Sequence, residues 1–552
     1  MLEGCVPWPE ELIKKYKEKG YWEDRAIGEV MEAAFERYHD KVAIISEDQR
    51  VTYRALGERV RRLALHFIEL GLRPYDRMVL QIHNIPEMIY LYCAAVTVGV
   101  IPVMALPPHR EAEVGYFAEF AEAKAYAIPG VFRKFDYQSM AKDLRAGIPS
   151  LEFVFVAGDD VYEGFYSINK LLADPIEQRV DAVTLRDFRP DPMEPAVFQL
   201  SGGTTGIPKF IPRTHNDYAY NFKRCAEVIH VDEDTVMLFA IPITHNFSVV
   251  SPGFQGILAN GGKAVLAPSA RPDDILPLIE KEKVTVVPAV PAIVVGLLNS
   301  PNRAKYNISS LTLIISGGSK LAPEVKRRIE PELCCKYQEV LGMAEGLNCW
   351  TLTGDPEEVC LYTQGRPMCP DDEIKVVDDR GKEVPRGEVG ELLVRGPYTI
   401  RGYYRSPERN KESFTEDGFY KTGDLVRMHP SGNLIVEGRK KDTINRGGEK
   451  ISAEEIENHI IAHTVVENCA CVGMPDPALE ERICCFVVCK AGEELTLEEL
   501  TEFLLQERRI ARFKLPERLE IVASLPLTKV GKVDKNALRE MIAEKLRQEG
   551  KP

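Results

Sequence analysis

The segment that decides the fold is Leu200-Ser201-Gly202-Gly203-Thr204-Thr205-Gly206-Ile207-Pro208-Lys209, which begins where an apolar run over residues 196–200 ends. Its glycines let the backbone turn tightly and approach a ligand, while its hydroxyl groups and lysine ammonium can bind phosphate oxygens. The segment lacks the Gly-Lys-Ser/Thr of a Walker loop and continues into Phe210-Ile211, so we expect a loop between two strands. A flexible hairpin without a ligand is the alternative for such a loop taken alone. The residues assigned to a polyphosphate are Ser201, Gly202, Gly203, Thr204, Thr205, Gly206 and Lys209.

Outside this segment, short apolar runs alternate with helical patterns along most of the chain. The expected strands cover residues 78–82, 153–156, 284–287 and 313–315. The expected helices cover residues 53–70 and 272–281. Such alternation indicates βα units, in which helices cover both faces of a sheet. The expected fold class is α/β, with a large N-terminal domain of helix-covered sheets and a distorted barrel, plus a small mobile α+β C-terminal domain.

The chain is expected to divide near residue 437. Residues 189–195 contain three prolines and indicate an extended linker, which marks a candidate subdomain boundary inside an N-terminal domain of residues 1–437. Residues 438–450 are polar and basic, and they precede capping-box patterns at Ser452-x-x-Glu455 and Thr496-x-x-Glu499. The C-terminal domain is therefore expected over residues 438–552.

The composition excludes several classes of protein. The 552 residues are 45% hydrophobic and 28% charged, as in soluble globular proteins. The net charge is -14, which would repel a polyanion, so nucleic acid is not an expected partner. The 13 cysteines show no zinc spacing and no CxxC pair, and they indicate free thiols in a reducing compartment.

One apolar stretch, residues 88–107, resembles a membrane span in composition. Gly99 and Pro102 interrupt it, so we expect a helix of about three turns followed by a short buried strand. The first residues contain neither a basic region nor an apolar stretch, and no signal peptide is expected. The prediction is a cytoplasmic protein without a membrane partner.

The ten residues 200–209, in their order, resemble the phosphate loop of the adenylate-forming enzymes. This superfamily comprises acyl- and aryl-CoA synthetases, peptide-synthetase adenylation domains and luciferases. Further motifs follow in family order at residues 317–319, 340–346, 363–367, 420–424 and 525–535. The resemblance implies an enzyme that uses ATP and Mg²⁺ to convert a carboxylic acid into its adenylate, with release of pyrophosphate.

The resemblance also implies roles for single residues. Lys532 matches the catalytic lysine of the family, and Lys441 matches the hinge about which the C-terminal domain turns. Thr205 and Glu345 match the residues that hold magnesium. The residues matched to the nucleotide are Gly317, Gly318, Ser319, Val340, Leu341, Gly342, Met343, Ala344, Asp424 and Arg439.

The segment His245-Asn246-Phe247 resembles the aryl-acid ligases of siderophore assembly, especially the 2,3-dihydroxybenzoate–AMP ligases. Amino-acid-activating relatives carry aspartate where this chain has Asn246, so the neutral amide disfavours an amino acid and suits a ring hydroxyl. The match makes His245 a catalytic gate of the pocket, with Asn246 at the 2-hydroxyl and Ser251 at the 3-hydroxyl. The residues matched to the acid are His245, Asn246, Phe247, Ser251, Gly317, Leu347, Asn348 and Lys532.

The resemblance therefore implies activation of 2,3-dihydroxybenzoate or a similar hydroxy-aryl acid. The acyl group would then pass to the phosphopantetheine of an aryl carrier protein in siderophore or nonribosomal peptide synthesis. An aryl- or acyl-CoA ligase that uses free coenzyme A is the alternative. Asn348 replaces the usual valine of the 2,3-dihydroxybenzoate ligases, and this extra amide makes a more polar acid such as a hydroxypicolinate possible. Salicylate-using relatives tend to carry a less polar residue at the Ser251 position, and the choice among these three acids stays open. A catalytically inactive nucleotide-binding protein is disfavoured, because Lys532, Glu345 and Asp424 are all present.

Overall fold

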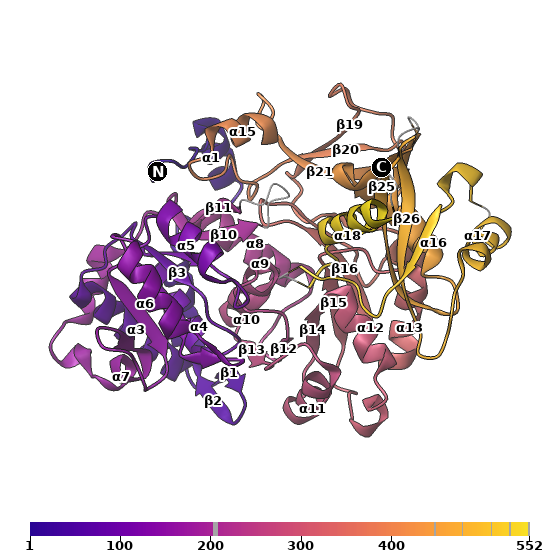
Figure 1. The fold of residues 1–552 in the computed structure, drawn as a ribbon. Helices are drawn as coiled ribbons and strands as arrows, with labels where there is room; N and C mark the ends of the chain where they lie inside the picture. Colours follow the sequence, from indigo (N-terminus) through magenta and orange to yellow (C-terminus); the bar gives the residue numbers. More distant parts are fainter. Residues whose placement is uncertain (202–207, 447–448, 477–478, 509, 529–530, 550–552) are drawn as a thin grey trace.

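The computed structural model describes residues 1–201, 208–446, 449–476, 479–508, 510–528 and 531–549. Two large sheets and the helices around them form the N-terminal part, and two smaller sheets follow along the chain (Figure 1). The expected α/β class, with a large N-terminal part and a small C-terminal part, is confirmed. Within the ranges given above, no helix has the length and apolar character needed to cross a bilayer.

The largest sheet has nine strands in the order β18-β17-β16-β15-β14-β12-β13-β1-β2. Its strands are β1 (Val42–Ser46), β2 (Gln49–Thr52), β12 (Val236–Phe239), β13 (Lys263–Leu266), β14 (Val286–Ala289), β15 (Leu313–Gly317), β16 (Lys336–Gly342), β17 (Asn348–Trp350) and β18 (Arg366–Pro367). The strands from β16 through β1 run parallel, so their carboxyl ends meet at one edge, where open α/β sheets bind ligands. The predicted strands at 284–287 and 313–315 overlap β14 and β15.

The second large sheet has seven strands in the order β11-β10-β4-β3-β5-β8-β9. Its strands, with the separate hairpin β6-β7, are β3 (Arg77–Leu80), β4 (Ile101–Met104), β5 (Ala125–Pro129), β6 (Val131–Phe132), β7 (Phe135–Asp136), β8 (Phe153–Ala157), β9 (Tyr166–Ser167), β10 (Pro195–Ser201) and β11 (Lys209–Thr214). β10 and β11 are antiparallel, with Ser201 opposite Lys209, which confirms that the phosphate-loop segment joins two strands. β10 also pairs with β4, so strands on both sides of residues 189–195 belong to one sheet, and the predicted linker does not separate two sheets.

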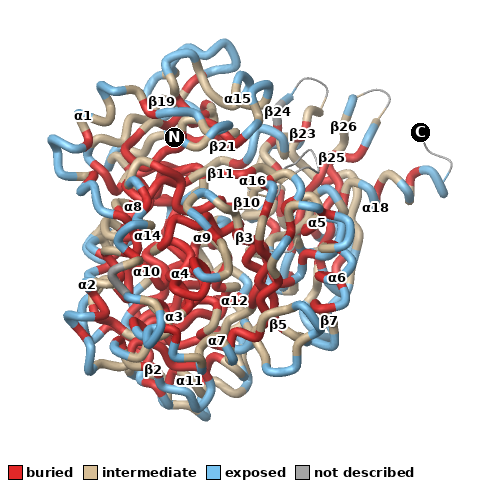
Figure 2. Tube along the Cα trace, turned by 90° about the vertical axis from the view of Figure 1, so that its left-hand side faces the viewer, coloured by how far each residue is buried: buried red, intermediate tan, exposed pale blue. Residues whose placement is uncertain are grey.

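The helix α4 (Pro86–Thr97) lies between the two large sheets, where it contacts β1 of one and β3 and β4 of the other. Each residue from Met88 to Val96 is at most 3% exposed, and Figure 2 shows buried residues concentrated in this region. Burial on all sides explains the apolar stretch 88–107, which forms a helix and the strand β4 as predicted. The other helices before residue 440 are α1 (Glu10–Glu18), α2 (Ile27–Arg37), α3 (Tyr53–Leu70), α5 (Glu111–Phe120), α6 (Tyr137–Gly147), α7 (Ile168–Ala173), α8 (His215–Val228), α9 (Asn246–Val250), α10 (Gly253–Ala259), α11 (Pro272–Glu282), α12 (Pro291–Asn299), α13 (Pro323–Leu333), α14 (Glu357–Tyr362) and α15 (Pro407–Ser413).

A four-stranded antiparallel sheet follows, in the order β19-β20-β21-β22. Its strands are β19 (Glu373–Val377), β20 (Gly390–Arg395), β21 (Tyr420–Met428) and β22 (Leu434–Arg439). This sheet is open, with β19 and β22 at its edges, and among the strands that the structure describes it does not close into a barrel. Four strands are too few to close around a core of side chains, which takes about eight.

The C-terminal part begins after a short 3₁₀ turn, Lys440–Asp442, at which the chain leaves one sheet and enters another. Its elements are β23 (Thr443–Arg446), β24 (Glu449–Ser452), α16 (Ala453–Ile460), β25 (Val466–Asp476), β26 (Glu480–Cys489), α17 (Leu497–Gln506), β27 (Arg518–Ile521) and α18 (Lys535–Gln548). Ser452 and Thr496 cap α16 and α17, since their hydroxyl groups accept from the amides of Glu455 and Glu499, as predicted.

Candidate active site

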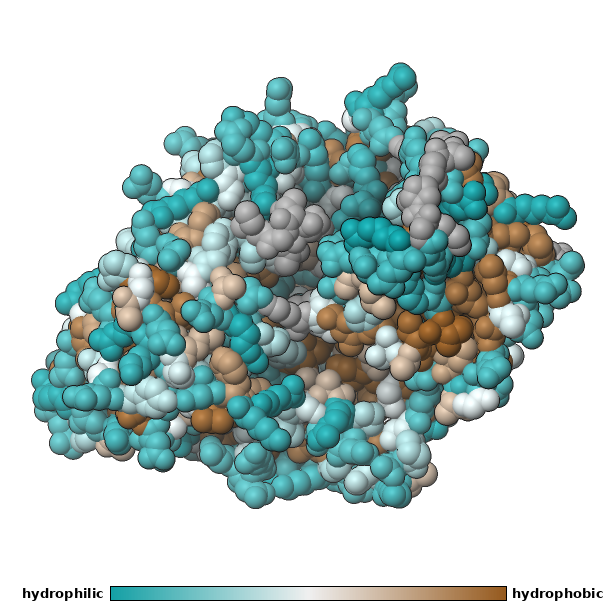
Figure 3. Space-filling view, viewed as in Figure 1, coloured by the Kyte–Doolittle hydropathy of each residue, from teal (hydrophilic) through white to brown (hydrophobic). Residues whose placement is uncertain are grey.

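The candidate site lies at the carboxyl ends of β15 and β16. Gly317 at the end of β15 pairs with Val340 of β16, so the two strand ends are adjacent. In Figure 1 these strands lie in the middle of the molecule beside the C-terminal part, and Figure 3 shows the surface hollowed in the middle of the same face. The predicted nucleotide residues carried by these two strand ends are Gly317, Gly318, Ser319, Val340, Leu341, Gly342, Met343 and Ala344.

Lys532 reaches this edge from the C-terminal part. A Cβ placed on Gly318 would lie 3.3 Å from Cε and 3.9 Å from Nζ of Lys532, so the glycine leaves room for the lysine. Gly318 also has φ of +89°, a conformation that favours glycine. The pKa of Lys532 is lowered to about 8, mainly by burial and also by the charge of Arg439, while Asp424 opposes the change. The structure thus brings the predicted catalytic lysine to the predicted nucleotide edge.

A hydrogen-bonded turn carries Lys532 between β27 and α18. The amide of Lys532 donates to Thr528 Oγ1 at 3.2 Å, and the amide of Thr528 donates to the carbonyl of Lys532 at 2.6 Å. Leu527 and Val533 form a β-bridge across the same turn. These bonds fix the backbone from which the long lysine side chain extends.

Asp424 and Arg439 face each other across β21 and β22. They are register partners, and Arg439 Nε lies 2.6 Å from Asp424 Oδ1. Asp424 is only 3% exposed, and burial raises the pKa of its carboxyl, an effect that Arg439 and Lys532 oppose. A buried carboxylate held by a guanidinium can accept hydrogen bonds from a pair of hydroxyl groups.

The phosphate side of the site is a chain of hydrogen bonds. Lys209 Nζ donates to Tyr403 Oη at 3.1 Å, and Tyr403 Oη donates to Glu345 Oε1 at 2.8 Å. Lys209 also lies 4.5 Å from the centre of the Tyr403 ring. Among the predicted phosphate-binding residues, Gly202, Gly203, Thr204, Thr205 and Gly206 lie outside the described residues. Ser201 and Lys209 mark the two ends of that segment.

Glu345 is suited to a metal ion that arrives with a nucleotide. Its carboxylate is buried, at 7% exposed. Across the described parts of the chain, no three His, Cys, Asp or Glu side chains gather as a metal site of their own. Mg²⁺ takes one or two carboxylates from a protein and completes its shell with substrate phosphates and water. One carboxylate beside a phosphate loop fits that pattern.

The turn that carries Glu345 is held by Arg213. The guanidinium of Arg213 is fully buried and donates to the carbonyls of Ala344 at 2.8 Å and Tyr398 at 2.9 Å. Its Nε pairs with Asp217 Oδ1 at 2.8 Å. Arg213 was not among the predicted site residues, because a single arginine in a strand carries no local pattern.

Replacing Arg213 with methionine is expected to destabilise the protein by about 3–5 kcal/mol, because Asp217 would remain buried without its counter-charge. Urea unfolding measures the change. Lys223→Met is the control: it removes a partly exposed pair with Glu23 (2.7 Å) and is expected to cost about 1 kcal/mol or less. Equal stabilities of the two variants would contradict this role for Arg213.

The predicted acid-binding segment begins at α9. His245 caps this helix, and its Nδ1 accepts from the Phe247 amide at 3.2 Å. The pKa of His245 is lowered to about 4, mainly by burial and also by the charge of Lys532, so the ring is neutral near pH 7. Because Nδ1 accepts a hydrogen bond, the proton is on Nε2. Asn246 Oδ1 accepts from the hydroxyl of Tyr218 at 2.8 Å, which leaves the Asn246 amide nitrogen to donate.

The other predicted acid-binding residues lie in different surroundings: some are buried polar groups, and one packs in an apolar cluster. Asn348 and Ser251 are buried, and the amide of Asn348 donates to the hydroxyl of Tyr398 at 3.0 Å. A Cβ on Gly317 would lie 3.6 Å from Cζ of Phe247, so these two residues are in contact. Leu347 packs instead in an apolar cluster with side chains of the four-stranded sheet.

Lys441 stands in the 3₁₀ turn between two sheets. It is among the charges that act on both Lys532 and Asp424. The turn is anchored on each side of Lys441: Lys440 pairs with Glu391 of β20 at 2.9 Å, and Asp442 pairs with Arg539 of α18 at 2.8 Å.

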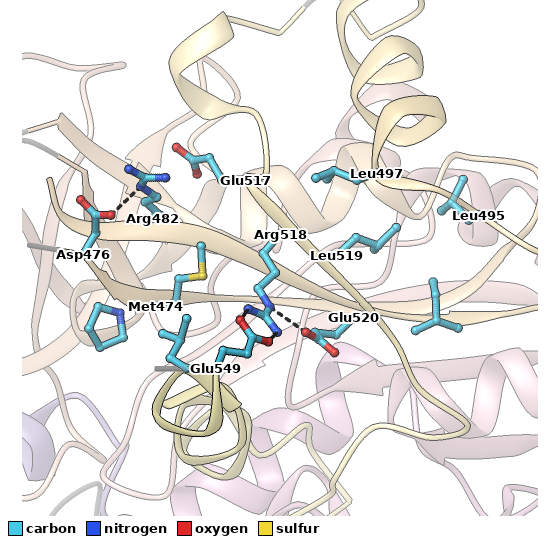
Figure 4. Close-up of a pocket in the computed structure, with 13 residues that line it drawn as sticks. Met474, Asp476, Arg482, Leu495, Leu497, Glu517, Arg518, Leu519, Glu520 and Glu549 are labelled. Carbon is cyan, nitrogen blue, oxygen red and sulfur yellow. Dashed lines mark hydrogen bonds and ion pairs between the residues drawn. The ribbon is translucent and has the colours of Figure 1, made fainter. Parts of the chain in front are cut away.

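A separate cavity of about 880 Å³ opens on the C-terminal part, along β25, β26 and β27 and the end of α18 (Figure 4). Arg518 in this cavity pairs with Glu520 at 2.7 Å and with Glu549 at 2.6 Å, and Arg482 pairs with Asp476 at 2.7 Å. None of the predicted site residues that the structure describes lines it. Both arginines of the cavity are thus paired within it, while Glu517 of its lining pairs with Arg446 at 2.6 Å.

Comparison with known proteins gives two family matches. Residues 31–404 match the AMP-binding enzyme family, and residues 455–532 match the AMP-binding enzyme C-terminal domain. The chain is 46% identical, over 99% of both sequences, to 2,3-dihydroxybenzoate-AMP ligase from Bacillus subtilis. It is 47% identical, over 98% of both, to a Streptomyces protein named salicylyl-CoA synthase / salicylate adenylyltransferase. Among solved structures, apo MbtA from Mycobacterium smegmatis superposes with a TM-score of 0.73 at 39% identity, covering 98% of this chain and 99% of that one.

Proposed function

The chain belongs to the AMP-binding enzymes, and on that basis we propose that it activates a hydroxy-aryl carboxylic acid with ATP and passes the acyl group to a thiol. The acid is 2,3-dihydroxybenzoate or a close analogue, and the thiol is the phosphopantetheine of an aryl carrier protein. The observation that carries the proposal is the contact between Lys532 and Gly318. It places an ammonium group of the C-terminal part at the nucleotide edge of the N-terminal part.

In the first step, a carboxylate oxygen of the acid attacks the α-phosphorus of ATP, and the bond to the bridging oxygen breaks to release pyrophosphate. Both reactants are anionic, so cations must cancel their repulsion and hold them in line. Lys532 bridges the carboxylate and the α-phosphate, while Lys209 faces the outer phosphates. Asp424 accepts hydrogen bonds from the ribose hydroxyls, and Arg439 orients its carboxylate.

Thr205 and Glu345 would hold the Mg²⁺ that accompanies ATP, and this ion supplies positive charge to the outer phosphates. The chain itself keeps the Glu345 carboxylate in a fixed position. Tyr403 holds the Glu345 carboxylate, and Arg213 holds the turn behind it.

The acid is held by α9 and its neighbours. The Asn246 amide nitrogen donates to the 2-hydroxyl oxygen, since its carbonyl oxygen is occupied by Tyr218. Ser251 meets the 3-hydroxyl, and neutral His245 stands at the entrance beside Lys532. An α-amino acid would find no carboxylate at position 246 to pair with its ammonium group.

In the second step, the thiol sulfur attacks the carbonyl carbon of the adenylate, the bond to AMP breaks, and the thiol proton leaves with the phosphate. We propose that residues 438–552 act as a mobile domain that turns about Lys441 relative to residues 1–437. Rotation withdraws Lys532 and brings Gly447 and Gly448, which lie outside the described residues, toward the thiol. Few backbone angles need to change in such a hinge.

ATP–pyrophosphate exchange tests the proposed substrate class. The panel contains 2,3-dihydroxybenzoate, salicylate, hydroxypicolinates, fatty acids and amino acids. Hydroxy-aryl acids are expected to exceed amino acids by about 10²-fold or more in kcat/KM, because buried polar groups discriminate strongly. Preference for an amino acid would overturn the proposal. Faster transfer to free coenzyme A than to a carrier protein would favour the CoA-ligase alternative.

The pKa of Lys532 sets the expected pH dependence. The lysine is cationic below its pKa, so its contribution is present at low pH and lost as the pH rises through about 8. We expect kcat/KM for pyrophosphate exchange to fall about tenfold per pH unit above that value. In Lys532→Arg, where the cation persists beyond about pH 12, residual activity should show no such fall. The same alkaline fall in this variant would assign the titration to another group.

We also propose that the protein works in a reducing, cytoplasmic compartment. All 13 cysteines are free thiols, and several are fully buried in the C-terminal sheet. Burial raises the pKa of buried thiols such as Cys471, which keeps them protonated and unreactive.

A further inference from the structure

We infer that Asn221 of α8 is a specificity-determining residue, which with Asn348 forms an amide pair that selects an aryl acid carrying a hydrogen-bond acceptor on the ring edge facing α8. The inference deepens the proposed function and rests on it. No role was predicted for Asn221. Its partner Asn348 was matched to the acid, at a position where the 2,3-dihydroxybenzoate ligases usually carry valine.

One face of α8 contacts the predicted acid-binding residues. Tyr218, Asn221 and Cys225 follow at spacings of three and four, which places them in one row on the helix. All three are fully buried. The Tyr218 hydroxyl bonds Asn246 at 2.8 Å, and Asn221 Oδ1 accepts from Asn348 Nδ2 at 2.8 Å. Each thus contributes to one wall around the same acid-binding residues.

The amide of Asn221 is held in one orientation. Its Oδ1 accepts from Asn348 Nδ2 and also from the Cys225 thiol, at 3.4 Å between heavy atoms. Two donors occupy both lone pairs of that oxygen, so a flipped amide would lose both bonds. The Asn221 nitrogen, with its two hydrogens, therefore occupies the other branch of the amide.

The Asn221 nitrogen is a buried donor without a partner. Nδ2 makes no hydrogen bond to any residue that the structure describes, although the side chain is fully buried. A buried donor left unpaired is costly, and a ligand acceptor that reaches it removes this cost. The structure therefore holds an unsatisfied donor on the helix face that contacts the acid-binding residues.

Asn348 does not satisfy this donor, because its Nδ2 donates to Asn221 Oδ1 and its own Oδ1 lies against Gly342. Its backbone amide is bound by the hydroxyl of Tyr398, and its Oδ1 lies so close to Gly342 that a Cβ there would overlap it. The pair is also neutral, so it offers no charge to a carboxylate or an ammonium group. Asn246 and Ser251 already meet the two ring hydroxyls of the proposed acid, so a ring nitrogen is the acceptor that fits this donor.

Replacing both members of the pair tests the inference. Asn221→Leu with Asn348→Val removes both amides together and leaves no buried amide without its partner. The readout is kcat/KM for ATP–pyrophosphate exchange with 2,3-dihydroxybenzoate, 3-hydroxypicolinate and salicylate, which lacks the additional acceptor. Wild type is expected to prefer 3-hydroxypicolinate, which has a ring nitrogen, over salicylate by about 10–100-fold. The double variant is expected to lose this preference, measured as the ratio of the two kcat/KM values within each protein.

The control is Lys223→Met, which lies on α8 but pairs with Glu23 at the surface. It should keep the wild-type preference. Loss of this preference, with the preference for 2,3-dihydroxybenzoate over salicylate retained, would identify a ring nitrogen as the acceptor, because Ser251 still meets the 3-hydroxyl. Equal loss of both preferences would show that the double variant disturbs the pocket as a whole, and it would overturn this assignment. An unchanged preference in the double variant, with normal exchange in wild type, would overturn this assignment alone. No exchange with any aryl acid in wild type would overturn the proposed function and this assignment with it.

Discussion

Replacing Lys532 with alanine is expected to lower the rate of adenylation by about 10²–10³-fold or more, which is the usual loss when a preorganised charge is removed from a site. The substitution leaves two anions, the acid carboxylate and the α-phosphate, without the ammonium that bridges them. ATP–pyrophosphate exchange with the preferred acid measures this step directly. Binding of ATP should change little, since Asp424, Arg439 and Lys209 remain.

The matched control is Lys545→Ala. Lys545 lies on α18, shortly after Lys532 in the chain, and pairs with Glu520 away from the nucleotide edge. Its exchange rate should remain within about threefold of wild type, because this partly exposed pair lies away from the reacting groups. Unchanged exchange in Lys532→Ala, with the protein folded, would refute the central assignment.

The local features of the fold were predictable because neighbouring residues determine them. Glycines between two apolar runs predicted the hairpin of β10 and β11. Gly99 marked the break between α4 and β4, and hydroxyl residues marked the starts of α16 and α17. Each of these signals acts over a few residues, and the structure confirms each one.

Features that depend on tertiary contacts were not predictable in this way. Arg213 acts through carbonyls that lie more than a hundred residues away, and Asn221 acts through a row of contacts that no sequence pattern reveals. Strand pairing across the fold decides whether a sheet closes, and the four-stranded sheet is open. Leu347 follows the turn of Glu345 in sequence, yet packs in the core behind it.

Lys441→Pro is expected to lower thioester formation by about 10²-fold or more while adenylation stays within about threefold, because misplacing reacting groups by about an ångström has effects of this size. Proline fixes φ near –65°, which is close to the value of a 3₁₀ turn. The orientation that places Lys532 beside Gly318 is therefore tolerated, whereas the rotation for the second step is blocked.

The anchors of the turn explain why position 441 is the place to test. Lys440 is bound to Glu391 of the four-stranded sheet, and Asp442 is bound to Arg539 of α18. Rotation at the single residue between them can preserve both ion pairs. Lys441→Ala, the control, removes the charge but keeps the backbone free, so both steps should stay near wild type. Loading of a carrier protein or coenzyme A, measured beside pyrophosphate exchange, separates the two steps. Equal loss of both steps in the proline variant would show that the turn supports the fold rather than the rotation.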